Sequence, residues 1–157
     1  MGSYITVGSP IGDLLLAEDN GALTCLKFGG DRLAPEGYRR AETPLLAAAG
    51  AQLREYFQGK RKTFDLPLAP AGTPFMSRVW EALRDIPYGE TRSYRDIAAA
   101  AGSPKAFRAV GRANNRNPLA IITPCHRVIG SDGSLVGYGG GLDVKEYLLR
   151  LEAGGAR

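Results

Sequence analysis

In the first seventy residues, short apolar segments alternate with turn residues, which is typical of a small β-sheet. Strands are predicted at residues 4–7, 13–18 and 22–28, because apolar and β-branched residues there are bounded by turn signals. The Asn20-Gly21 pair favours a tight hairpin between the second and third strands. Residues 29–38 are expected to form a loop, and residues 62–66 one further strand.

One helix is predicted in this part of the chain. Thr43 is a suitable N-cap and Pro44 suits the first helical position, while Gly59 ends the helix. Apolar residues recur between them with helical spacing: Leu45, Leu46, Ala49, Leu53, Tyr56 and Phe57. Because Pro67, Pro70 and Gly72 then read as a linker, residues 1–70 are predicted to be a scaffold domain of sheet plus helix, without a catalytic motif.

Residues 71–157 are predicted to be mainly helical, which makes the whole chain α+β. Thr73-Pro74 repeats the cap-plus-proline signature, and that helix ends at residues 86–89. Ser93 with Asp96 is a capping-box-like start for a short helix. Another helix is expected from Ser103-Pro104 to about residue 114, and a last one over residues 142–152.

The two short helices around the Gly102 turn have the helix-turn-helix pattern. In the second helix one face is predicted to hold Phe107 and Val110 together with Asn114 or Gly111. Another face carries basic residues, and one more follows just past the helix end: Lys105, Arg108, Arg112 and Arg116. This predicts a nucleic-acid-binding helix, with a solvated basic surface as the alternative.

The charge distribution favours the same interpretation. Residues 1–70 are neutral overall, and residues 71–157 hold the whole excess of +4. Residues 92–116 alone carry six basic groups against Asp96, a net +5. Local basicity of this kind indicates an anionic partner, with nucleic acid the leading candidate.

Composition excludes several other classes. At 44% hydrophobic and 23% charged residues the chain resembles an ordinary globular protein, with no membrane-spanning or secretory segment expected. Two cysteines are too few for a disulfide framework, so an intracellular location is expected. Two cysteines and one histidine supply at most three ligands, and closed zinc sites need four, so we expect no metal.

The candidate chemistry is concentrated in residues 121–130, which hold the only histidine and one of the two cysteines. Pro124 stiffens the chain ahead of Cys125. A cysteine is a good nucleophile only as a thiolate, so His126 and Arg127 are candidates for activating it. In an extended segment neighbouring side chains point to opposite faces, so His126 needs a bend or a bridging water to act on Cys125. The alternative is that both residues are structural core residues.

Two later features add to this interpretation. Residues 137–141 are a glycine run around Tyr138, which permits close approach of backbone to a ligand unless it is a plain linker. Glu152 lies at the end of the last predicted helix, where a carboxylate gains nothing from the helix dipole. It is therefore a candidate for orienting an imidazole.

Together these segments resemble the O(6)-alkylguanine-DNA alkyltransferase family. The resemblance covers about residues 73–154 and is carried by an ordered set of motifs: Ser93-Tyr94, Pro104-Lys105, Arg108-Ala109-Val110-Gly111, Asn117-Pro118, Pro124-Cys125-His126-Arg127-Val128, and Tyr138 through Gly141 leading to Val144-Lys145-Glu146. Residues 1–70 resemble the family's N-terminal domain only in the order of strands and helix.

The resemblance implies repair of O(6)-alkylguanine in double-stranded DNA by irreversible alkyl transfer to Cys125, and it leaves open whether O(4)-alkylthymine is also a substrate. It implies that His126 and Glu152 draw the thiol proton away through a water and that Asn117 braces the turn. Tyr94 is implied to help rotate the nucleotide out and to protonate the base. No cofactor is implied, a monomer is expected, and clustering on DNA is left open.

The resemblance also implies the binding residues. Arg108 is the finger that fills the space of the displaced nucleotide, while Ser93, Lys105, Arg112 and Arg116 contact DNA. The flipped base is expected to lie against Tyr138, Gly139, Gly140, Lys145 and Val128.

Three departures from the family pattern bear on substrate range. Thr123 replaces a branched aliphatic residue, Gly139 stands where many members have serine, and the zinc ligands of some members are absent. A non-catalytic alkyltransferase-like lesion binder is the alternative, although such proteins lack the acceptor cysteine. A hydrolase using Cys125, His126 and Glu152 is a third possibility, which leaves the basic helix unexplained.

Overall fold

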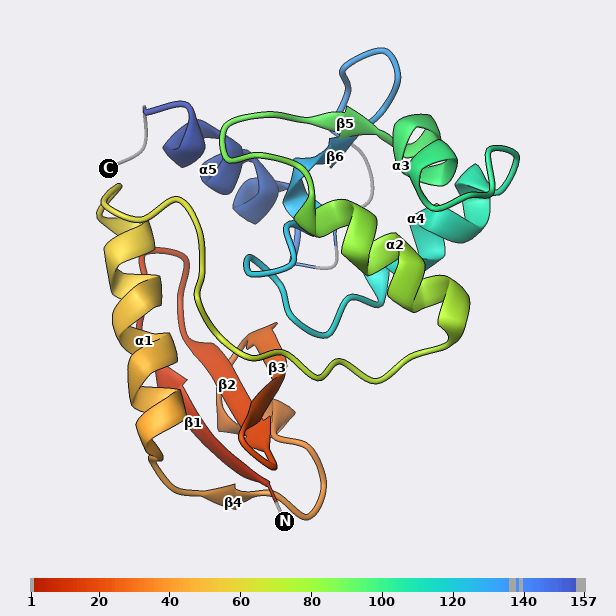
Figure 1. Ribbon diagram of the computed structural model, residues 1–157. Coiled ribbons are helices and arrows are strands. Elements are labelled where there is room, and N and C mark those ends of the chain that lie inside the picture. The colour runs from red at the N-terminus through yellow and green to blue at the C-terminus, as the bar shows by residue number, and fades with distance from the viewer. Residues whose placement is uncertain (1, 136–137, 139, 155–157) are drawn as a thin grey trace. The chain divides into compact units, whose positions relative to one another are not determined.

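The computed structural model describes residues 2–135, 138 and 140–154, which form two compact units (Figure 1). The first comprises residues up to Ala71 together with Pro118–Ala120, and the second comprises Gly72–Asn117 and the chain from Ile121 onward. The α+β class predicted from the sequence is confirmed. The contribution of residues 118–120 to the first unit is an addition that no local pattern indicated.

The first unit is a four-stranded sheet in the order β3-β2-β1-β4. Its strands are β1 (Ser3–Val7), β2 (Leu14–Asp19), β3 (Ala22–Phe28) and β4 (Arg39–Arg40); the first three are antiparallel neighbours, while β4 pairs parallel with β1. The hairpin between β2 and β3 turns at Asn20 and Gly21, whose φ angles of 52° and 78° suit the predicted Asn-Gly turn.

Both faces of this sheet are covered. Leu15 and Ala17 of β2 pack with Cys25 and with side chains of the 29–38 segment, which includes a short 3-10 helix, η1 (Asp31–Leu33). On the other face lies helix α1 (Pro44–Phe57), along β1 and β2 (Figure 1). The Thr43 hydroxyl accepts a hydrogen bond from the Leu46 amide at 3.2 Å, as the N-cap prediction required.

The strand predicted over residues 62–66 is wrong. Instead, Leu68 forms an isolated bridge with Leu23, and Leu119 forms one with Leu26. These two short segments cover the outer edge of β3, whose unpaired backbone groups would otherwise be exposed. Residues 62–66 lack hydrogen-bonded strand neighbours because the segment that reaches β3 begins later, at Pro67.

The second unit contains four α-helices: α2 (Pro74–Arg84), α3 (Tyr94–Ala100), α4 (Phe107–Asn115) and α5 (Leu142–Glu152). A short parallel pair joins β5 (Arg92–Ser93) to β6 (Val128–Ile129), and the 3-10 helix η2 (Cys125–Arg127) immediately precedes β6. The Thr73 cap of α2 and the Ser93–Asp96 capping box of α3 are both present, as predicted.

Helix α4 starts three residues later than predicted. Residues 103–106 form a turn closed by a hydrogen bond from the Ala106 amide to the Ser103 carbonyl at 2.9 Å. Pro104 occupies the second position of this turn, which its fixed φ favours. Lys105 therefore lies in the turn between α3 and α4 and not on the second helix.

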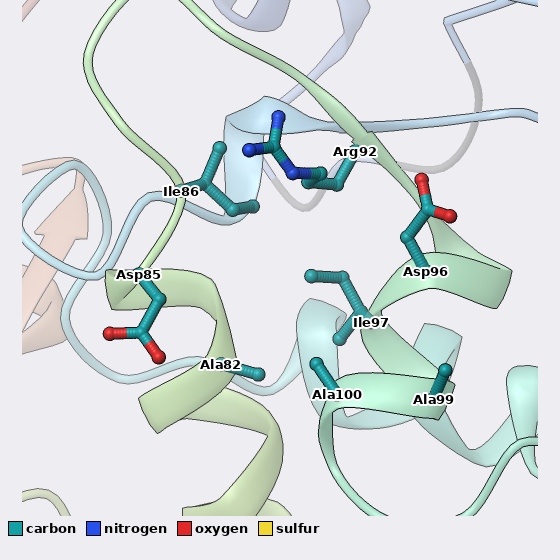
Figure 2. A pocket seen from close by; sticks show the side chains of 8 residues that line it. All are labelled: Ala82, Asp85, Ile86, Arg92, Asp96, Ile97, Ala99 and Ala100. Atoms are coloured by element: carbon teal, nitrogen blue, oxygen red, sulfur yellow. The ribbon is translucent and has the colours of Figure 1, made fainter.

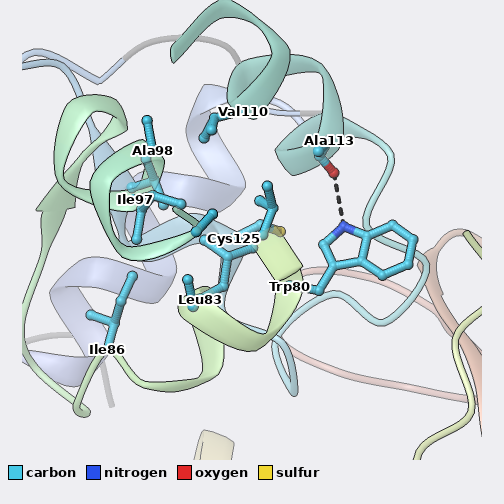
Figure 3. Packing of buried hydrophobic residues seen from close by; sticks show 12 residues of the cluster. Trp80, Leu83, Ile86, Ile97, Ala98, Val110, Ala113 and Cys125 are labelled. Atoms are coloured by element: carbon cyan, nitrogen blue, oxygen red, sulfur yellow. Dashed lines mark hydrogen bonds between the residues drawn. The ribbon is translucent and has the colours of Figure 1, made fainter. Parts of the chain in front are cut away.

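The core of the second unit gathers apolar residues from α2, α3 and α4 around Cys125 and Val128 (Figure 3). Trp80 is its largest buried side chain, and its indole N–H donates to the Ala113 carbonyl at 2.9 Å. This hydrogen bond ties α2 to the end of α4. It also satisfies the polar atom of a large buried aromatic residue.

Replacing Trp80 by Phe should reduce the free energy of unfolding by about 2 kcal/mol or more, because the Ala113 carbonyl loses its buried donor and the smaller ring leaves space. Urea unfolding followed by circular dichroism measures the change. Leu83→Met, a nearly volume-conserving change in the same cluster, should cost less than about 1.5 kcal/mol. Equal losses in the two variants would contradict a specific role for the indole hydrogen bond.

Candidate active site

The chain bends at the cysteine. Pro124 has φ −81° and ψ 67°, and Cys125–Arg127 form the 3-10 helix η2, closed by a hydrogen bond from the Arg127 amide to the Pro124 carbonyl at 3.0 Å. The bend that the sequence analysis left open as one way for His126 to act on Cys125 is therefore present, and strand pairing begins only at Val128. The bend removes the strict alternation that would have turned neighbouring side chains to opposite faces.

Three side chains hold this bend from different helices and turns. The Asn117 amide donates to the Thr123 carbonyl at 2.8 Å, and the Asn114 amide donates to the Cys125 carbonyl at 3.4 Å. The Thr123 hydroxyl accepts from the Arg84 guanidinium at 3.1 Å. The threonine that departs from the family's aliphatic pattern thus has a polar partner on α2.

The thiol itself is buried among apolar side chains (Figure 3). Burial raises the pKa of Cys125, since a thiolate loses solvation there, while hydrogen bonds with Asn117 and Tyr138 and the charge of Lys145 act in the opposite direction. The thiol donates to the Tyr138 hydroxyl at 3.9 Å. At neutral pH the cysteine is protonated at rest and needs a base to become a nucleophile.

Behind the cysteine lies a buried cluster of one anion and two basic side chains. Glu152, at the end of α5, accepts hydrogen bonds on both carboxylate oxygens: His126 Nε2 lies 2.6 Å from Oε2, while Arg127 donates from Nε to Oε1 at 2.8 Å and from Nη2 to Oε2 at 3.0 Å. Arg127 also donates from Nη1 to the Ile86 carbonyl at 2.8 Å. The carboxylate is thus held by a two-point guanidinium contact and by the imidazole.

The charge states of this cluster follow from burial and pairing. Burial by itself would raise the pKa of Glu152, but hydrogen bonds from His126 and Arg127 outweigh it and hold that pKa well below its usual range. Burial lowers the pKa of His126, and the neighbouring Glu152 only partly opposes this effect. The resting cluster is therefore a Glu–Arg ion pair with a neutral imidazole attached.

The two nitrogens of that imidazole differ. Nε2 is engaged by Glu152, whereas Nδ1 is buried with no hydrogen-bond partner among the described residues. If Nε2 carries the proton that Glu152 accepts, Nδ1 is the basic lone pair. A neutral His126 in this tautomer can accept one proton and become a cation against the Glu152 carboxylate.

Further predicted site residues surround the thiol. Lys145 is buried on α5, donates to the Val128 carbonyl at 2.5 Å and has its Nζ 5.8 Å from the centre of the Tyr138 ring. Tyr94 is half-buried and packs against the apolar cluster that contains Cys125. Burial raises the pKa of Tyr94, and the charge of a Cys125 thiolate raises it further. Gly140 lies in the turn before α5, and Gly139 lies outside the described residues.

The predicted DNA-contacting residues separate into two groups. Arg108 and Arg112 are exposed on α4, and Arg116 is exposed at its C-terminal end. Lys105 is exposed in the preceding turn. Ser93 differs from these, because its hydroxyl accepts a hydrogen bond from the Asp96 amide at 3.1 Å and caps α3.

Sequence reasoning did not assign two residues of this site. Arg127 was recognised only as a cation near the thiol, although its guanidinium contacts Glu152 and not the sulfur. Asn114 was noted only as part of a helix face, and an amide among apolar positions of that face was the available signal. No local pattern reveals that a carboxylate 25 residues away is the partner of Arg127.

A surface hollow of about 570 Å³ lies elsewhere in this unit, between α2, β5 and α3 (Figure 2). Its wall includes Arg92 and Asp96, but Arg92 pairs with Glu90 at 3.1 Å and Asp96 caps α3. None of the predicted catalytic residues lines it. The hollow is therefore not the candidate active site.

Among the described residues, no group of three or more His, Cys, Asp or Glu side chains is arranged to hold a metal ion. No helix in that part of the chain has the length and apolar character needed to cross a membrane.

Glu152→Gln should destabilise the protein by about 3 kcal/mol at pH 7, because Arg127 is left as a buried charge without its counter-ion. Because the pKa of Glu152 is lowered in the folded state, its ionised carboxylate stabilises the fold at pH values above the unfolded-state pKa of about 4.3. This stabilisation is lost as the pH falls below that value. The difference between wild type and variant should therefore shrink below about pH 4.

Urea unfolding at several pH values measures this difference. Glu146→Gln is the matched control, since Glu146 is on the same helix in an exposed ion pair with Arg150, which is worth under about 1 kcal/mol. A loss in Glu152→Gln that is independent of pH between 7 and 3 would show that the carboxylate charge is not what stabilises the cluster.

Comparison with known proteins gives consistent matches along the chain. Residues 3–70 match the family described as "6-O-methylguanine DNA methyltransferase, ribonuclease-like domain", and residues 74–154 match "6-O-methylguanine DNA methyltransferase, DNA binding domain". The methylated-DNA–protein-cysteine methyltransferase of Methanosarcina barkeri is 52% identical over 162 aligned residues, covering 98% of this chain and 99% of that protein.

Other relatives agree. The constitutive methylated-DNA–protein-cysteine methyltransferase of Bacillus subtilis is 51% identical and covers 97% of this chain and 96% of its own length. A crystal structure of Mycobacterium tuberculosis OGT in complex with DNA superimposes with a TM-score of 0.90 at 48% identity, over 97% of this chain and 93% of that one. This chain therefore belongs to the 6-O-methylguanine DNA methyltransferase family.

Proposed function

We propose that this protein is a DNA-repair methyltransferase that flips O(6)-alkylguanine out of duplex DNA and transfers the alkyl group irreversibly to its own Cys125. The observation that carries the proposal is the buried Cys125 thiol, close to Tyr94, Tyr138 and Lys145, with the His126–Glu152–Arg127 cluster behind it. A buried reactive group cannot reach a base inside the stacked duplex, so its substrate must be a nucleotide flipped out of the DNA.

The transfer is a displacement at a saturated carbon. The Cys125 thiol proton passes through a bridging water to His126 Nδ1, and the resulting imidazolium is stabilised by Glu152. The sulfur then bonds to the alkyl carbon while the bond from that carbon to guanine O6 breaks. The electron pair of that bond goes to guanine, which takes a proton from Tyr94. The products are a thioether on Cys125 and unmodified guanine, so each molecule reacts once.

Each supporting residue has a stated task in this proposal. Lys145 supplies positive charge that lowers the pKa of the thiol and contacts the flipped base together with Tyr138, Gly139, Gly140 and the Val128 backbone. Asn117 keeps the turn before the cysteine in place through Thr123. Arg127 fixes the Glu152 carboxylate so that one oxygen faces the imidazole.

The partner is DNA, and the contacts proposed for it lie on and around α4. Lys105, Arg112 and Arg116 neutralise phosphates without reading sequence. At Ser93 the phosphate is proposed to contact the backbone at the start of α3, because the Ser93 hydroxyl is already engaged in the helix cap. Arg108 enters the duplex in place of the extruded nucleotide, and Tyr94 crowds the neighbouring phosphate.

Further parts of the proposal concern organisation. Residues 1–70 serve as a scaffold and residues 71–157 carry DNA binding and transfer, apart from residues 118–120, which belong to the first compact unit. The protein is proposed to act as a monomer. An intracellular, nucleoid-associated location follows from chromosomal DNA being the substrate.

Reaction with DNA containing O(6)-methylguanine should add one methyl group per protein molecule, on Cys125. Intact-mass and peptide measurements after reaction identify the site, and Cys125→Ser should take up no label. Label on Cys25, or continued turnover beyond one equivalent, would exclude the proposed chemistry. Tight binding of lesion DNA with no transfer at all would indicate the non-catalytic lesion binder instead.

Arg108→Ala should slow repair in duplex DNA far more than reaction with the free O(6)-alkylguanine base. Extruding a nucleotide costs a few kcal/mol, and only the duplex reaction needs it. The quantity to compare is the ratio of duplex to free-base rate constants, with Arg112→Ala as the control for loss of a phosphate contact. If both variants change that ratio equally, Arg108 is an ordinary phosphate contact.

A further inference from the structure

Phe107, at the first position of α4, is exposed where its apolar character predicts burial. Its exposed fraction is 38%, and among the described residues only Leu142 is a comparably exposed large apolar side chain. Val110 and Asn114, three and seven residues later on the same side of α4, are buried. Phe107 is therefore the exposed first residue of a helix face whose later residues pack on the core.

The ring has a defined partner on the neighbouring helix. The Arg95 guanidinium of α3 lies 5.5 Å from the ring centre, within the range of a cation–π contact. Arg95 is itself exposed and brings a positive charge to the ring. The aromatic side chain is thus held in place at the surface before any partner binds.

Phe107 lies on the side of α4 that faces Tyr94. It precedes Gly111 by one helical turn, and a Cβ built on Gly111 would lie 4.0 Å from the Tyr94 ring. Tyr94 in turn packs against the apolar cluster that contains Cys125. Phe107, Gly111 and Tyr94 therefore lie on one side of α3 and α4, and Tyr94 connects this side to the cluster around the thiol.

The surroundings of the ring are basic. Lys105 and Arg108 are its near neighbours in sequence, Arg95 lies against it, and all three are exposed. A second copy of this chain would bring like charges together at such a surface. DNA is complementary to this surface, because its phosphates are negatively charged and its sugars and base edges offer apolar contact between them.

We propose that Phe107, held by Arg95, is a non-ionic DNA contact that packs against the deoxyribose and base edges beside the nucleotide displaced by Arg108. The inference rests on the proposed function and deepens it, since it assigns part of duplex affinity to an apolar contact. Aromatic contacts of this kind with nucleic acid do not depend on counter-ion release, and phosphate contacts do.

Binding of wild type and variants to a fluorescent duplex at several salt concentrations tests the inference. Phe107→Ala should bind about tenfold more weakly at every salt concentration, with an unchanged slope of log affinity against log salt. Arg112→Ala should instead flatten that slope by about 0.9. Phe107→Leu, which keeps an apolar side chain, should recover part of the loss.

Phe75→Ala is the matched control, because the Phe75 ring on α2 also carries a stacked guanidinium, that of Arg78, at 5.6 Å. Its duplex affinity should stay within about twofold of wild type. Wild-type affinity in Phe107→Ala, or a flattened slope, would overturn the inference and leave the proposed function standing. Failure of wild type itself to bind duplex DNA would instead overturn the proposed function.

Discussion

The structure around the active site depends on one buried carboxylate. Glu152 is almost inaccessible to water, and an isolated carboxylate in that position would take up a proton. The two-point contact with Arg127 keeps it ionised, and the remaining interaction on Oε2 orients His126. Removing one member of such a buried pair typically lowers the free energy of unfolding by about 3–5 kcal/mol. Stability and the proposed chemistry therefore depend on the same contact.

This arrangement explains how a thiol can be both buried and usable. The apolar cluster around Cys125 raises the pKa of the thiol and so disfavours the free thiolate. The same burial lowers the pKa of His126 and leaves the imidazole neutral and able to accept a proton. In the proposed transfer, the charge needed for reaction would therefore form only when the proton moves, and Glu152 is already in place to stabilise a His126 imidazolium.

The backbone leading to the cysteine is held under strain. Ile121 has φ 70°, a region that β-branched residues rarely adopt, and its side chain is buried. Such a conformation costs of order 1–3 kcal/mol and persists only when surrounding contacts impose it. Here Asn117 and Arg84 hold Thr123, and Asn114 holds the Cys125 carbonyl, so the bend is determined by side chains from outside the segment.

Much of the fold followed from local sequence. The Asn20-Gly21 hairpin, the Thr-Pro helix starts, the Ser93–Asp96 box and the last helix depend on neighbouring residues, and the structure contains them all. The candidate chemical residues were also recognisable, because the nucleophilicity of a thiol, the basicity of an imidazole and the charge of arginine belong to the residue types themselves. Local periodicity failed at residues 62–66 and at the start of α4, where sheet pairing and a proline turn decided the outcome.

The sequence by itself thus determined the α+β class and the helix-turn-helix, and it predicted which residues carry the proposed chemistry. Only the tertiary structure decided that Arg127 pairs with Glu152, that His126 Nδ1 has no hydrogen-bond partner among the described residues, and that Phe107 is exposed against Arg95. The physical reason is that these properties arise from contacts between residues distant in sequence, and burial and charge pairing exist only once those residues have been brought together.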